Sequence, residues 1–201
     1  MNVLVPDCSS FTVTFRGVEE SLLHQLCAFY LPDLPPEQAG AIQRGYDCWS
    51  DTETLLPPCA RRRRTPRRTP GGQRGYVLRS RSGRRLHGVY VVDIPDEQLA
   101  DLSRCNAVLQ DAAAAEDGPL HKALAELGPG AGEALVRLDR TLALLRLRPP
   151  GALFDALPRD ETDGPVPVTL DTSQEAAYWN YYGQLAGLTG GDATHCPCRT
   201  P

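Results

Sequence analysis

Hydrophobic residues recur along this chain in two patterns, and each predicts a type of secondary structure. Alternation with β-branched residues is typical of strands, and spacings of three and four are typical of amphipathic helices. The patterns predict strands at residues 11–15, 76–80, 86–94 and 166–170, and helices at residues 18–30, 37–49, 95–115, 119–127, 133–148 and 172–185. Because strands and helices mix without regular alternation, we expect an α+β fold with a small mixed sheet and several amphipathic helices.

Two of the predicted helices have buried faces that can be named from their spacing. In the first helix, the apolar residues Val18, Leu22, Leu26 and Phe29 share one face, and acidic residues occupy the first turn. The clearest pattern runs from 133 to 148, where leucines repeat at three, four and three residues. We expect both faces to be buried.

The periodic pattern dissolves between about residues 50 and 75, and arginine, proline and glycine dominate from residue 57 onward. Such a composition cannot bury enough apolar surface to fold by itself, so this segment is predicted to be disordered. The expected organisation is a strand–helix part at 1–56, the disordered segment at 57–75, a hairpin with helices at 76–186 and a flexible tail at 187–201.

Charge is unevenly distributed in the 201 residues. The formal net charge is only -4, from 21 basic and 25 acidic residues. Residues 61–85, however, contain eleven arginines and no acid, so this segment carries +11 and the remainder carries -15. A charge concentration of this kind favours an anionic partner.

The densest part of the basic segment supports two interpretations. Clustered guanidinium groups on an extended chain match the acidic grooves of nuclear import receptors, which predicts a nuclear-targeting signal. The same groups could contact the phosphates of a nucleic acid. The arginines concerned are Arg61, Arg62, Arg63, Arg64, Arg67 and Arg68.

Three hydroxyl side chains are candidate phosphorylation sites. Thr65 and Thr69 each precede a proline inside the arginine cluster, where a phosphate would remove roughly 1.5 to 2 units of positive charge. Ser50 is followed by Asp51 and Glu53, a pattern favoured by acidophilic kinases.

Two further clusters carry candidate binding residues. His195, Cys196 and Cys198 supply soft ligands that could form half of a zinc site. A pair of free thiols is the simpler interpretation. Four aromatic residues fall within five positions of the last helix and could pack in the core or form a partner surface. They are Tyr178, Trp179, Tyr181 and Tyr182.

No sequence signature of an enzyme is present: His-Glu-x-x-His, Gly-x-Ser-x-Gly and Cys-x-x-Cys are all missing. The chain has no long apolar run and no leader pattern, so we expect a nuclear or cytoplasmic protein that is not secreted, with reduced cysteines and no membrane partner. No cofactor is expected, apart from the zinc alternative.

The function predicted from these patterns is that of a non-enzymatic regulatory or adaptor protein with a nuclear-targeting segment. Its partner would be a protein that contacts a helical surface, at 133–148 or 172–185, together with an import receptor. The arginine-rich composition is also compatible with an accessory protein of a GC-rich DNA virus. The alternatives are a nucleic-acid-binding protein that uses residues 61–85 and a small enzyme without a recognisable motif.

Overall fold

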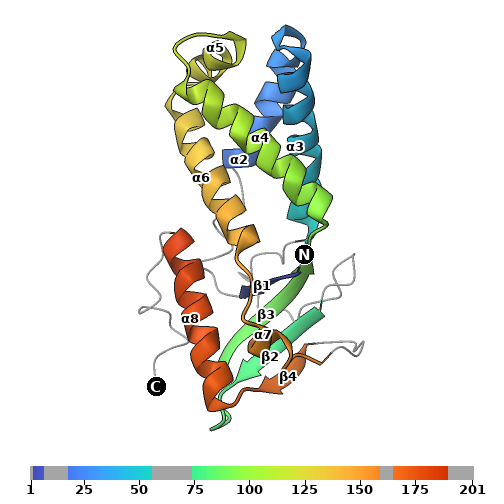
Figure 1. The fold of residues 1–201 in the computed structure, drawn as a ribbon, viewed down its shortest axis with the longest axis vertical. Helices are drawn as coiled ribbons and strands as arrows, with labels where there is room; N and C mark the ends of the chain where they lie inside the picture. The colour runs from blue at the N-terminus through green and yellow to red at the C-terminus, as the bar shows by residue number, and fades with distance from the viewer. Residues whose placement is uncertain (1, 7–17, 56–73, 159–164, 190–201) are drawn as a thin grey trace. The chain divides into compact units, whose positions relative to one another are not determined.

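The structure of the protein is a computed structural model, and it describes residues 2–6, 18–55, 74–158 and 165–189 (Figure 1). The chain divides into two compact units that interleave along the sequence. Unit 1 contains Met1–Thr14, Leu55–Asp93 and Leu144–Pro201, and unit 2 contains Phe15–Thr54 and Ile94–Ala143. The expected organisation followed the chain in order, whereas each compact unit draws on separated stretches.

Unit 1 is built on a mixed sheet whose strand order is β1-β3-β2-β4. Strand β3 (Arg85–Asp93) pairs antiparallel with β1 (Asn2–Pro6) on one side and with β2 (Arg74–Arg79) on the other. The edge strand β4 (Val166–Thr169) runs parallel to β2. Together with the helices, this sheet confirms the predicted α+β class.

The last helix, α8 (Thr172–Thr189), supplies the aromatic part of the core of unit 1. Tyr181 donates a hydrogen bond from its hydroxyl to the carbonyl of Leu4 in β1, at 3.0 Å. On the neighbouring strand, His87 lies against the rings of α8. A single turn of helix, α7 (Gly151–Phe154), precedes the last strand, and Gln174 of α8 reaches the carbonyl of Ala152 in this turn.

Unit 2 is helical in the part that the structure describes. Its elements are α2 (Val18–Gln25), a π-helix (Leu26–Tyr30), a short 3-10 helix (Leu31–Asp33), α3 (Pro36–Leu55), α4 (Asp96–Ala114), α5 (Pro119–Glu126) and α6 (Pro129–Arg146), whose last residues belong to unit 1. None of the helices described in either unit is long and apolar enough to cross a membrane.

Most of the expected elements are present, with shifts at their ends. The hairpin strands, α4, α5 and the parallel edge strand lie within two residues of the predicted bounds. Helix α3 continues to Leu55 rather than ending at Trp49, and α6 begins at Pro129 rather than Glu133, because Pro129 can occupy the first turn of a helix. The strand predicted at 11–15 lies outside the described residues.

The prediction that Phe29 belongs to the core is wrong. The spacing of the first helix places it on the buried face, yet its side chain is 70% exposed. The helix widens into a π-helix at Leu26, where the amide of Leu31 bonds the carbonyl of Leu26. The wider turn changes the phase of the following side chains, so Phe29 no longer shares a face with Leu22 and Leu26.

Candidate functional site

The hairpin formed by β2 and β3 carries an exposed group of arginines in unit 1. Residues 74–85 contain five arginines and no acid. Each of the five side chains is exposed, and four of them lie within seven residues at the tip of the hairpin. We name the tip group the arginine hairpin; it consists of Arg79, Arg81, Arg84 and Arg85.

The turn of this hairpin is held by backbone groups and by one buried serine. Ser80 donates its amide to the carbonyl of Arg84 at 2.8 Å and accepts the amide of Gly83 at its own carbonyl, also at 2.8 Å. The Ser80 hydroxyl accepts the amide of Arg84 at 3.1 Å and bonds the Ser82 hydroxyl at 2.7 Å. Gly83 adopts φ of 84°, a conformation that favours glycine. The only arginine side chain that the described contacts place in this turn is that of Arg79.

That one contact is weak, and the charges at the tip are close together. The guanidinium of Arg79 donates to the carbonyl of Gly83 at 3.4 Å. Arg79 and Arg85 are direct partners in the strand register. Like charges directly opposite each other in a sheet are destabilising. The hairpin therefore keeps a repulsive pair at a position where an anion would relieve the repulsion.

A described acid that interacts electrostatically with Arg81 of the hairpin, Asp171, is already engaged in capping α8. The pKa of Asp171 is lowered mainly by the backbone amide of Gln174, then by the Ser173 hydroxyl, with a smaller effect from Arg81. The corresponding hydrogen bonds to its carboxylate measure 2.8 and 2.7 Å. No acid among the described residues forms an ion pair with the arginine hairpin. Within the described part of the chain, its guanidinium groups therefore have no acid in an ion pair with them.

Below its tip, the hairpin is anchored in the core of unit 1. His87 of β3 is only 1% exposed and its Nδ1 is hydrogen-bonded to the hydroxyl of Tyr178. The imidazole stacks on Tyr182 with ring centroids 4.8 Å apart and 18° between the planes, and Trp179 meets it edge-on at 5.6 Å. The exposed tip is thus an extension of a packed element.

The aromatic cluster itself lies in the core. Tyr178, Tyr181 and Tyr182 are buried, and Trp179 is half-buried. Burial raises the pKa of the Tyr181 hydroxyl well above its usual value. Of the two alternatives that the sequence left open, these positions favour core packing over a partner surface.

Of the remaining predicted site residues, Ser50 lies in the described part of the chain and the others do not. Ser50 is exposed on α3, as a modification site requires. Within the described ranges, no group of three or more histidine, cysteine or acidic side chains could hold a metal ion. The residues outside these ranges are Arg61, Arg62, Arg63, Arg64, Arg67, Arg68, Thr65, Thr69, His195, Cys196 and Cys198.

The three cysteines that the structure describes, on the π-helix, α3 and α4, form no disulfide. Burial, followed by the charge of Asp47, raises the pKa of Cys27 to about 11. Burial raises the pKa of Cys105 to about 12. Both thiols are therefore protonated at neutral pH, which disfavours a role as nucleophile or redox sensor.

Comparison with protein-family models, with curated proteins and with solved structures finds no match for this chain. The assignment of a function therefore depends on the site alone. From the sequence, the arginines of the arginine hairpin contribute only to the charge of the basic segment. The signal that could have indicated a separate site is their spacing around the turn at Ser82 and Gly83.

Proposed function

We propose that this chain is a non-enzymatic binding protein whose arginine-rich region contacts the phosphate backbone of a nucleic acid. The observation that carries the proposal is the arginine hairpin, with four exposed guanidinium groups on a folded turn and no described acid in an ion pair with them. Arginine forms bidentate hydrogen bonds with phosphate, and a two-stranded β-ribbon fits the major groove of DNA.

The folded state of the hairpin favours this partner over an import receptor alone. Targeting arginines act on an extended chain, where each side chain can enter a groove of the receptor. Arg79 and Arg85 belong instead to paired strands, and their backbones are occupied by the sheet. The arginine hairpin therefore presents its side chains in a fixed arrangement, which fits a broad anionic surface.

The test is the affinity of the full chain for a labelled DNA duplex, measured by fluorescence anisotropy over a range of salt concentrations. Replacing Arg81 and Arg84 with glutamine removes two guanidinium groups without removing a described ion pair. Each lost phosphate contact lowers the slope of log K against log salt by about 0.9, so we expect a decrease of about 1.8. At physiological salt the affinity should fall roughly tenfold or more.

A matched control removes two exposed arginines elsewhere. Arg140, within α6, and Arg148, just after its end, are both exposed. Replacing both with glutamine changes the net charge equally and should leave the affinity within about twofold, because phosphate contacts act at short range. No affinity of the wild-type chain for DNA at low salt, or equal losses in the two double variants, would refute the proposal.

Nuclear targeting is a second proposal, supported by six arginines within the eight residues 61–68. Replacing these six residues with alanine should move a tagged protein out of the nucleus, as seen by fluorescence microscopy, without lowering its melting temperature. The variant at Arg81 and Arg84 is the control and should remain nuclear. If the alanine variant localises like the wild type, this segment does not direct import.

A regulatory or adaptor role through protein contacts remains a prediction alongside these proposals. The aromatic rings of α8 are largely used in the core, which leaves α6 as the better of the two helical surfaces first considered. On α6, Val136 is 51% exposed.

A further inference from the structure

Unit 2 contains a cleft of about 620 Å³, within the size range of small-molecule sites. Residues of α3 and α4 line it, together with the loop that leads into α5 and the first residues of α5. None of residues 74–85, the described part of the basic segment, lines it. The cleft is therefore a candidate binding site separate from the arginine hairpin.

The two sides of the cleft run in opposite directions. The guanidinium of Arg44 on α3 lies 3.5 Å from the carboxylate of Asp101 on α4, and one residue further on, Gly45 packs against Cys105. Because α3 and α4 run in opposite directions (Figure 1), Glu37, which precedes Arg44 on α3, and Asp111, which follows Arg104 on α4, lie toward the same end of the cleft. With a rise of 1.5 Å per residue, Glu37 lies roughly 10 Å from Arg44 along α3, and Asp111 lies roughly 10 Å from Arg104 along α4.

This arrangement separates the charges of the cleft into two ends. At one end stand Arg44 and Arg104, and at the other stand Glu37 and Asp111. Between them, the lining is apolar, with the buried Ala41 on α3 facing the same cleft as Val108 of α4. A ligand that fits this order has an anionic group, an aliphatic stem and a cationic group.

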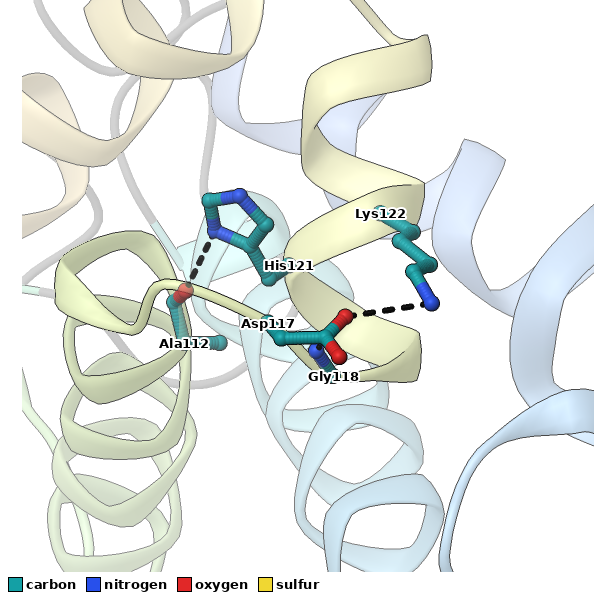
Figure 2. Close-up of polar contacts among 5 residues, drawn as sticks. All are labelled: Ala112, Asp117, Gly118, His121 and Lys122. Atoms are coloured by element: carbon teal, nitrogen blue, oxygen red, sulfur yellow. Dashed lines mark hydrogen bonds and ion pairs between the residues drawn. The ribbon is translucent and has the colours of Figure 1, made fainter.

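The acidic end offers acceptors rather than donors. Figure 2 shows that a ring nitrogen of His121, Nδ1, bonds the carbonyl of Ala112 at 3.2 Å. A carbonyl only accepts, so Nδ1 donates in this hydrogen bond. Gln38, also in the lining, has a buried Oε1 without a hydrogen-bond partner in the described part of the chain.

The remaining carboxylate near this end is already satisfied. Asp117 accepts the amide of Gly118 at 2.8 Å and the ammonium of Lys122 at 3.1 Å, as Figure 2 shows. These contacts hold the pKa of Asp117 below its usual range, the amide of Gly118 contributing most. The carboxylates left for a ligand are those of Glu37 and Asp111, which suit a group with several N–H donors.

The basic end has a complementary preference. Arg44 already has Asp101 as a counter-ion, whereas Arg104 forms no ion pair with any acid that the structure describes. Guanidinium groups donate hydrogen bonds and accept none, so they bind an anionic acceptor such as a carboxylate.

We propose that this cleft binds an arginine with a free α-carboxylate, either as the free amino acid or as the last residue of a peptide. The carboxylate would bind Arg104 and Arg44, the methylene groups would lie against Ala41 and Val108, and the ligand's guanidinium would bind Glu37 and Asp111. Guanidinium suits the acidic end better than ammonium, because its planar array of donors can serve two carboxylates and further acceptors at once.

Isothermal titration of the full chain with matched ligands tests the proposal. L-arginine should bind, whereas agmatine, which lacks the carboxylate, and L-citrulline, which lacks the charge, should each bind roughly tenfold more weakly or worse. A peptide that ends in arginine separates the two sources. Tighter binding of this peptide than of L-arginine, lost when its carboxylate is amidated, identifies a chain end, and the reverse order identifies the free amino acid.

Variants locate the binding. Arg104→Gln and Asp111→Asn should each weaken L-arginine binding roughly tenfold, and Arg104→Gln should bring L-arginine close to agmatine, because the carboxylate contact is gone. Arg140→Gln and Glu116→Gln are exposed controls outside the lining and should bind as the wild type does. Circular dichroism verifies that each variant is folded.

Three results overturn the proposal: no binding of L-arginine or of the peptide at millimolar concentration, equal binding of agmatine and L-arginine, or wild-type affinity in both Arg104→Gln and Asp111→Asn. DNA binding by the arginine hairpin is measured separately, so either proposal can fail while the other holds.

Discussion

Replacing Tyr182 with alanine is expected to lower the free energy of unfolding of unit 1 by about 3 to 5 kcal/mol, the cost typical of removing a buried aromatic ring. Tyr182 is 2% exposed and stacks on His87 at 4.8 Å. Trp179 packs edge-on against it at 5.7 Å. Without this ring, the imidazole of β3 loses its stacking partner and α8 loses a contact with the sheet.

Urea denaturation followed by circular dichroism measures this loss. Asn180→Ala is the matched control, because Asn180 is exposed two residues earlier on the same helix. Its effect should stay within about 0.5 kcal/mol. Since His87 anchors the hairpin, Tyr182→Ala should also weaken duplex binding under conditions where it is still folded. Similar stabilities of Tyr182→Ala and Asn180→Ala would contradict the role given to the aromatic cluster.

Replacing Gly45 with alanine is expected to destabilise unit 2 by about 1 to 3 kcal/mol, the usual cost of overpacking a core. A Cβ at this position of α3 would overlap the Cβ and Sγ of Cys105 on α4. The sign is opposite to that of helix propensity, which favours alanine over glycine by about 1 kcal/mol inside a helix. The substitution therefore separates close packing from propensity.

A second glycine on the same helix provides the control. At Gly40, the nearest atom to an added Cβ is in the flexible guanidinium of Arg44, at 3.4 Å. Gly40→Ala should thus be neutral or stabilising by up to about 1 kcal/mol. Thermal denaturation of both variants measures the difference. If Gly45→Ala is as stable as Gly40→Ala, α3 and α4 do not approach each other as closely as described.

The sequence predicts the elements whose signals are local. The β2–β3 hairpin follows from a short turn between two apolar runs, and α6 follows from its leucine spacing; the leucines at 135, 138, 142 and 145 are all buried. Strand β1 was missed because its five residues, which end in Pro6, have little strand signal of their own. The pairing that makes them a strand comes from β3.

The candidate sites divide in the same way. The charge of the basic segment is readable from the sequence, and so is the turn that exposes the arginine hairpin. The cleft of unit 2 was not predictable, because Glu37 on α3 becomes a neighbour of Asp111 on α4 only after the two helices pack. The approach at Gly45 was hidden for the same reason, since a glycine within a helical pattern usually indicates only a weaker helix.

The interleaved assembly of the two units sets an order in which they can form during synthesis. Unit 2 has all of its residues once Ala143 has left the ribosome. Unit 1 must wait longer, because β1 pairs with β3 and the aromatic rings that anchor the hairpin lie in α8, near the end of the chain. The arginine hairpin is therefore translated early but acquires its support late, so the nascent chain exposes this basic hairpin before the core beneath it exists.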